Sequence, residues 1–235
     1  MNRIQHIIEP NRVWLVWQSN SPGQTRSRRF VGEVRNAVEG KGITFSYLEG
    51  TDDFNLAKAE GFDGFPAFKM NSQDHSQGVL EAFMRRLPPR NREDFNEYLE
   101  RHRLPENFNY SDLALLAYTG AKLPSDSFEF CADLIDATPP LEMVMEIAGF
   151  RHHNGCSSSE LVLGDVVTFI PEPQNQFDPE AVAIMYKNHC IGYVGRTYTR
   201  SINHWLSMDY TIEAIIERIN GKPERPLIYL YVTVQ

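Results

Sequence analysis

The sequence has few cysteines and no long apolar run. Three of its 235 residues are cysteine, an odd number that gives no disulfide framework and is typical of a reducing compartment. No stretch approaches the roughly 18 apolar residues of a membrane span, and the N-terminus has no apolar segment followed by a small-residue cleavage site. We therefore expect a soluble cytoplasmic protein.

Catalytic motifs are also missing. The chain contains no Gly-x-Ser-x-Gly elbow, no Walker-type phosphate loop and no His-Glu-x-x-His. Asp178 and Glu180 are candidates for part of a magnesium nuclease site, but no lysine follows at Glu-x-Lys spacing, which favours a solvated turn. We expect a protein that is not an enzyme and has no cofactor, with the metal-dependent nuclease as a less favoured alternative.

Two clusters of histidine and cysteine are candidates for a zinc site, namely His153-x-x-Cys156 and His189-Cys190. They supply nitrogen and sulfur ligands, yet their spacing matches no standard zinc finger. Small buried residues are the more common role of such cysteines, so no metal is expected.

Positive charge is scarce. The formal net charge is −8, and from residue 145 onward seven Lys and Arg face ten Asp and Glu. This excludes a polybasic nucleic-acid arm or a membrane-surface binder, so any contact with nucleic acid depends on a local patch. In the first half, three arginine-rich stretches are either a second patch or solvated faces: residues 26–29, 85–86 and 90–92.

The first half of the chain predicts an α+β domain over residues 1–133. Runs of branched and aromatic residues predict a small antiparallel sheet, which helices with capping residues and apolar 3.6-residue spacing follow. The expected strands cover residues 12–18, 29–35 and 42–48, with a turn at 40–42, and the expected helices begin near residues 54, 79, 94 and 111. Five aromatic residues here are expected in the core or facing a partner: Phe45, Tyr47, Phe62, Phe65 and Phe68.

A proline-containing segment at 134–142 predicts the linker to a second domain, residues 143–235. This second domain is rich in short apolar runs, which predict a barrel or sandwich with one helix near residues 199–206. The expected strands cover residues 144–149, 166–170, 181–186, 191–194, 210–216 and 227–234.

The stretch from Pro171 to Met185, with Cys190-Ile-Gly-Tyr-Val-Gly-Arg196 after it, places a polar loop bearing one aromatic ring between two strands. A loop held on a rigid sheet is suited to ligand binding. Aromatic rings at such a junction stack on bases, whereas buried rings fill a core, and both roles remain open for Phe177. Asp178 is either a ligand contact or a turn residue that bonds its own backbone.

Residues 144–234 resemble the HIRAN domain, a small barrel related to the OB fold. The resemblance rests on these runs: Gly149-Phe-Arg-His-His153, Gly164-Asp-Val-Val167, Glu172-Pro-Gln-Asn-Gln-Phe-Asp178, Ala181-Val-Ala-Ile184 and Ile191-Gly-Tyr-Val194. It implies an all-β, OB-like barrel that binds the 3′-hydroxyl end of single-stranded DNA. Histidines 152 and 153 stand where the family has tyrosines.

The resemblance also implies roles for individual residues. Phe177 would stack on a terminal base, Asp178 would contact the 3′-hydroxyl, and Asn175 would contact a base or sugar. The remaining implied DNA-binding residues are Arg151, His152, His153, Tyr193 and Arg196, the last as a phosphate contact. On a strand, the two adjacent histidines would point to opposite faces, so that only one could face the ligand.

Residues 12–66 are similar to the opening β-subdomain of HipA-type toxin kinases, on the runs Val13-Trp-Leu-Val-Trp17, Val31-Gly-Glu-Val34 and Ile43-Thr-Phe-Ser-Tyr-Leu48. No kinase core follows.

We expect a bacterial-type, non-catalytic protein of DNA repair or defence that binds single-stranded or damaged DNA, with the N-terminal domain contacting a protein partner. The alternative is an antitoxin-like regulator of a HipA-type kinase.

Overall fold

The computed structural model describes all residues except 1, 21–26, 37–41, 72 and 154. The chain forms two compact units, and each is interrupted in sequence. The first unit comprises Met1–Ile7, Arg103–Pro105 and Leu134–Gln235, and the second comprises Ile8–His102 and Glu106–Asp133. The segment expected as a linker, 134–142, overlaps the first unit and ends inside a strand.

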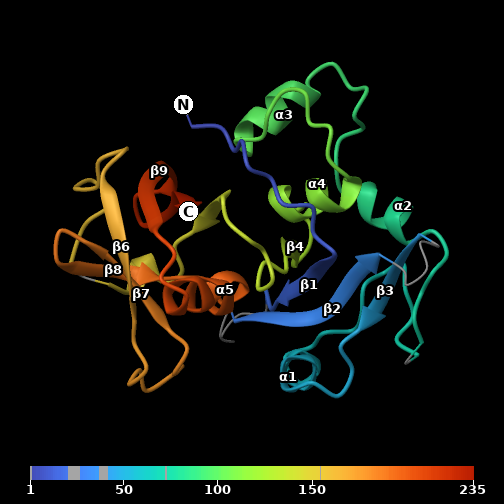
Figure 1. The fold of residues 1–235 in the computed structure, drawn as a ribbon. Coiled ribbons are helices and arrows are strands. Elements are labelled where there is room, and N and C mark those ends of the chain that lie inside the picture. The colour runs from blue at the N-terminus through green and yellow to red at the C-terminus, as the bar shows by residue number, and fades with distance from the viewer. Residues whose placement is uncertain (1, 21–26, 37–41, 72, 154) are drawn as a thin grey trace. The chain divides into compact units, whose positions relative to one another are not determined.

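The second unit contains a four-stranded antiparallel sheet in the order β3-β2-β1-β4 (Figure 1). Its strands are β1 (Arg12–Gln18), β2 (Arg28–Asn36), β3 (Ile43–Tyr47) and β4 (Phe128–Ala132). Apolar residues of β1 alternate toward the core, and Val13 and Leu15 are fully buried. The sequence predicted β1 to β3 but not β4, so the three-stranded sheet expected from the sequence is a four-stranded one.

The described residues of this unit form the helices α1 (Asp52–Ala59), α2 (Val79–Met84), α3 (Phe95–Arg101) and α4 (Asp112–Thr119). Thr51 and Ser111 cap α1 and α4, because each side chain accepts the backbone N–H of the third residue of its helix. α1 packs on β2, and α4 packs on β4 and β1 (Figure 1).

The five aromatic residues singled out from the sequence form much of this unit's core. Phe45, Phe62, Phe65 and Phe68 are buried, and the ring of Phe45 lies 4.8 Å from that of Tyr47. The Tyr47 hydroxyl donates to the Phe68 carbonyl at 2.7 Å. Such buried rings are unavailable for base stacking. The expected turn at 40–42 lies largely outside the described residues.

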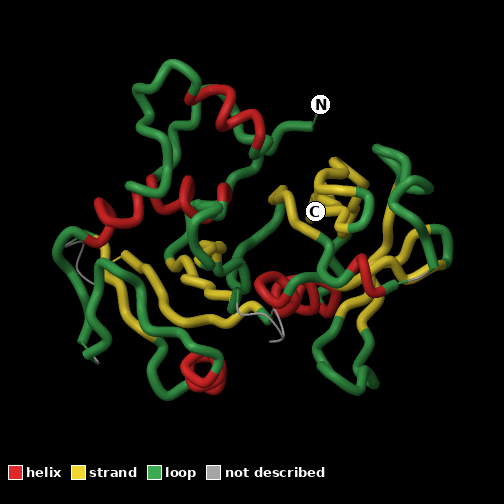
Figure 2. Tube along the Cα trace, turned by 180° about the vertical axis from the view of Figure 1, so that it is seen from behind, coloured by secondary structure: helices red, strands yellow, loops and turns green. Residues whose placement is uncertain are grey.

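The first unit contains a six-stranded antiparallel sheet in the order β5-β10-β9-β6-β7-β8 (Figures 1 and 2). Its strands are β5 (Leu141–Glu146), β6 (Val166–Pro171), β7 (Val182–Tyr186), β8 (His189–Tyr193), β9 (Ile212–Lys222) and β10 (Arg225–Val234). In β5, Leu141, Met143 and Met145 are buried while the residues between them are partly exposed, as period-two alternation requires.

The two edges of this curled sheet meet through one bridge. Ala148, just beyond β5, exchanges two backbone hydrogen bonds of 2.9 Å with Tyr193 of β8. The described strands thus form a curled half-barrel with a bridge between its edges, where the resemblance implied an OB-like barrel. Glycine is required at 192, because a Cβ there would lie 2.5 Å from Ile147 Cγ2.

α5 (Arg196–Ser207) is the longest helix among the described residues and lies beside the strands of the first unit (Figure 2). It follows Gly195 and buries Ile202 and Trp205. The N-terminal segment belongs to the same unit: the backbone N–H of His6 donates to the Glu142 carboxylate at 2.9 Å. No helix among the described residues has the length and apolar composition needed to cross a bilayer.

Candidate nucleic-acid interface

The loop between β6 and β7, residues 172–181, has a base closed by backbone hydrogen bonds. The N–H of Glu172 donates to the Ala181 carbonyl at 2.8 Å, and the N–H of Ala181 donates to the Asp178 carbonyl at 3.0 Å. The antiparallel pairing of Pro171 with Val182 continues directly into this closure. The loop is therefore mounted on a rigid pair of strands.

Asn175 organises the interior of the 172–181 loop. Its Oδ1 accepts the backbone N–H groups of Phe177 at 3.0 Å and Asp178 at 3.3 Å. Its Nδ2 donates to Glu172 Oε2 at 2.9 Å. The side chain that the resemblance assigned to a base or sugar contact is thus engaged in holding the loop.

Phe177 projects from this loop with 87% of its surface exposed. Most phenylalanines are buried, so an exposed ring on an internally hydrogen-bonded loop is unusual for a folding role alone. Of the two roles left open by the sequence, burial in the core is wrong. The exposed ring has the geometry that base stacking needs.

Asp178 follows and forms a turn of its own. Its Oδ1 accepts the backbone N–H of Glu180 at 2.9 Å, the turn role considered from the sequence. The Glu180 carbonyl in turn accepts from Asn203 Nδ2 of α5 at 2.7 Å. The end of the loop is thus fastened to a helix on one side and a strand on the other.

Tyr193 joins the loop to β8. Its hydroxyl donates to Glu172 Oε2 at 3.1 Å, and the ring of His153 lies 5.4 Å from its own ring. The pKa of Tyr193 is raised chiefly by burial, and also by the hydrogen bond and the negative charge of Glu172. The phenol therefore keeps its proton at neutral pH. Four predicted site residues therefore share one connected set of contacts: Asn175, Phe177, Asp178 and Tyr193, with His153 against the last.

Arg151 and His152 lie in η1 (Phe150–His152), a short 3₁₀ turn. The two histidines do not lie on a strand, so the alternation of faces that a strand would impose does not apply to them; Gly149 adopts a left-handed conformation with φ 77° and starts this turn. Arg151 Nε donates to His152 Nε2 at 3.0 Å. Among the described residues, neither of the two makes a hydrogen bond or ion pair with the 172–181 loop.

Charges of both signs surround the site. Arg196 is the first residue of α5 and is exposed, as is Arg151. Against these two cations stand the carboxylates of Glu172, Asp178 and Glu180. A nucleic acid bound here would contact few phosphates, so its binding would be modest and sensitive to salt.

Comparison with known proteins finds similarity in this part of the chain. Residues 141–235 match the HIRAN domain family. We call these residues the HIRAN region. Similar solved structures are the HIRAN domain of human HLTF (16% identity, TM-score 0.34, covering 40% of this chain and 74% of that chain) and a protein from Lactobacillus plantarum (17% identity, TM-score 0.33, covering 39% and 92%).

A search of curated proteins gave no match. The HIRAN match supports a DNA-binding domain in residues 141–235. It does not reach residues 12–66, and the resemblance of that segment to HipA-type kinases is without support from any of the comparisons.

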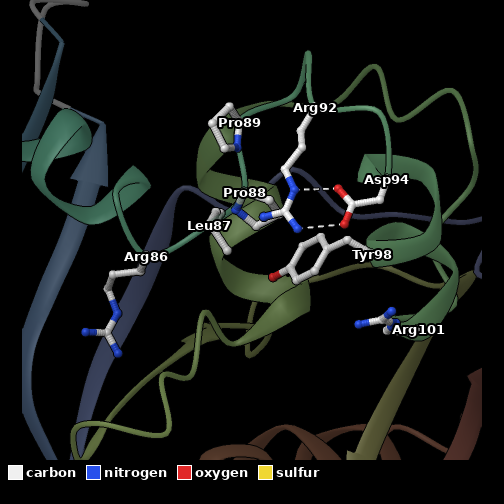
Figure 3. Close-up of a pocket in the computed structure, with 8 residues that line it drawn as sticks. All are labelled: Arg86, Leu87, Pro88, Pro89, Arg92, Asp94, Tyr98 and Arg101. Atoms are coloured by element: carbon white, nitrogen blue, oxygen red, sulfur yellow. Dashed lines mark hydrogen bonds and ion pairs between the residues drawn. The ribbon is translucent and has the colours of Figure 1, made fainter.

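The second basic patch considered for the first half consists largely of ion-paired arginines. A cavity of about 390 Å³ in the second unit is lined by Arg86, Arg92 and Arg101 (Figure 3). Arg92 pairs with Asp94, which also lines this cavity, whereas Arg86 pairs with Asp126 at 2.6 Å. Arg28, Arg29, Arg85, Arg90 and Arg101 also have carboxylate partners, and Arg26 lies outside the described residues.

Among the residues that the structure describes, which include the two clusters considered for zinc, no three His, Cys, Asp or Glu side chains are placed to hold a metal ion. The Cys156 thiol donates to the Ser157 carbonyl at 3.4 Å, and that of Cys190 to the Gly192 carbonyl at 3.5 Å.

Glu172 is the residue of the site that the sequence reasoning did not single out. It lies inside the run 172–178, where the resemblance implied roles only for Asn175, Phe177 and Asp178. Its role depends on Tyr193, which approaches from another strand, so the neighbouring sequence carries no signal of it.

Proposed function

We propose that this protein binds single-stranded or damaged DNA through its HIRAN region, without catalysis of its own, and that it recognises a 3′-hydroxyl end. The observation that supports this most is the exposed ring of Phe177 on a loop fixed from inside by Asn175. A ring held in this way stacks on a base of any sequence, and each such contact contributes about 1–3 kcal/mol.

Recognition of an end is favoured by the neighbouring carboxylate. Asp178 follows the ring directly, and a carboxylate repels phosphate but accepts a hydrogen bond from a hydroxyl. In mid-strand DNA a phosphodiester follows each sugar at O3′, whereas a 3′ end offers a hydroxyl there. The acidic loop is therefore better matched to a terminal nucleotide.

The test compares two labelled single strands that differ only at the 3′ position, one ending in a hydroxyl and one in a phosphate. Fluorescence anisotropy should show at least tenfold tighter binding of the hydroxyl strand. Equal affinities would refute end recognition, and binding of neither strand at low salt would refute the DNA-binding function itself.

The proposal rests on the HIRAN region alone. The protein partner expected for the N-terminal half has no support from the comparisons.

Absence of catalysis is tested separately: incubation with magnesium or manganese should leave single- and double-stranded DNA uncut, and the appearance of cleavage products would contradict it.

A further inference from the structure

Glu172 occupies the base of the loop that carries Phe177. Its backbone closes the loop, since its N–H donates to Ala181 and its carbonyl accepts from the Asn175 N–H at 2.9 Å. One oxygen of its carboxylate, Oε2, accepts from both Asn175 Nδ2 and the Tyr193 hydroxyl. The residue thus connects the start of the loop, its interior and β8.

The carboxylate also determines which way the Asn175 amide faces. An amide group has a donor end and an acceptor end, and an acceptor-only carboxylate bonds only the donor end. With Nδ2 held by Glu172, Oδ1 of Asn175 is directed to the N–H groups of Phe177 and Asp178. A rotated amide would present Nδ2 to those N–H groups and lose both bonds.

We propose that Glu172 is a positioning residue of the DNA site, which acts through Asn175 and Tyr193 to hold Phe177 and Asp178 in place. This inference rests on the DNA-binding function proposed above. Glu172 itself does not contact the ligand.

Charge alone gives no reason for a carboxylate here. Glu172 has no ion-pair partner among the described residues, and a negative charge beside a DNA site weakens phosphate binding. Its use as a double acceptor accounts for its presence. Hydrogen bonding and charge can be separated experimentally, because the Oε1 of a glutamine accepts the same two bonds without the charge.

The binding test uses three variants of the full chain and a short single strand with a 3′-hydroxyl. Glu172→Ala should weaken binding about tenfold, which corresponds to about 1.4 kcal/mol. Glu172→Gln should bind within about twofold of wild type or tighter. Glu180→Ala is the matched control, since it removes an exposed carboxylate from the same loop, and it should bind at least as tightly as wild type.

A second measurement needs no DNA. Amide hydrogen exchange at Phe177 and Asp178 should be about tenfold faster in Glu172→Ala than in wild type, and close to wild type in Glu172→Gln and Glu180→Ala. If Glu172→Ala does not fold, Tyr193→Phe takes its place in this measurement, because it removes one of the two donors to Glu172. It should also speed amide exchange at Phe177 and Asp178, but by less than tenfold.

The outcomes separate the two proposals. Wild-type protein that binds no DNA refutes the proposed function, while the exchange data still report whether Glu172 orders the loop. Wild-type protein that binds, together with Glu172→Ala that binds equally well, overturns the positioning role. If Glu172→Gln neither binds DNA as wild type does nor shows wild-type amide exchange, the positioning role is overturned as well.

Discussion

The hydroxyl of Tyr193 on β8 donates a 3.1 Å hydrogen bond to Glu172 Oε2 at the start of the 172–181 loop. The same carboxylate oxygen accepts a hydrogen bond from Asn175 Nδ2 inside the loop. The same tyrosine makes the backbone bridge to Ala148 that joins the two edges of the sheet. The bridge between the sheet edges and the hydrogen bond to the loop therefore come from the same residue of β8.

Gly192→Ala should destabilise the HIRAN region by about 3 kcal/mol. The new Cβ would lie 2.5 Å from Ile147 Cγ2 and 2.6 Å from the Ala148 carbonyl oxygen, at a φ of 144°. Urea unfolding measures the loss. Gly164→Ala is the control, because φ is 87° there but no atom lies within 4 Å of the added Cβ, so only the strain of about 1 kcal/mol is expected. Equal effects of the two substitutions would contradict the close approach at Gly192.

Arg86→Met should destabilise the second unit by about 3 kcal/mol at pH 7. The buried guanidinium makes two bonds to Asp126 and donates to the carbonyls of Ala121 and Phe128, and its loss leaves Asp126 without its cation. Arg85→Met is the matched control, since the pair with Glu81 is exposed and its loss should cost under about 0.5 kcal/mol.

The effect of Arg86→Met should depend on pH. Burial tends to raise the pKa of Asp126, but Arg86 and the Phe128 N–H outweigh it and lower that pKa. The stabilisation is therefore fully present above the unfolded value of about 4 and is lost as pH falls through the folded value. The difference in unfolding free energy between wild type and variant should therefore narrow below pH 4, while the part due to the Ala121 and Phe128 carbonyls remains. A constant difference down to pH 2 would contradict this assignment.

Local patterns in the sequence were sufficient for much of the fold. Arg12–Gln18 is a strand as predicted, and the capping residues Thr51 and Ser111 mark helix starts because their side chains bond backbone groups nearby in sequence. Phe128–Ala132 was missed because four of its five residues are buried, so it lacks the alternation that identifies a strand with one exposed face. Its identity depends on pairing with β1, more than a hundred residues away.

The candidate loop was predictable from the sequence, but its internal geometry was not. The sequence placed Asn175, Phe177 and Asp178 on one loop and left the exposure of the Phe177 ring open, and the structure shows the ring exposed. The role of Glu172 depends on the approach of Tyr193 from another strand, which no local pattern reveals. The 3₁₀ turn at Arg151 and His152 depends on the left-handed conformation of Gly149, which competes with strand continuation.

The most direct test of DNA binding by this site is an anisotropy titration of a short 3′-hydroxyl single strand with wild type, Phe177→Ala and Met208→Ala. Met208 is an exposed apolar residue of the same unit outside the loop, so its truncation controls for loss of apolar surface. We predict that Phe177→Ala weakens binding at least tenfold, with unfolding stability within about 0.5 kcal/mol of wild type, and that Met208→Ala binds as wild type does. Unchanged affinity in Phe177→Ala would contradict the account.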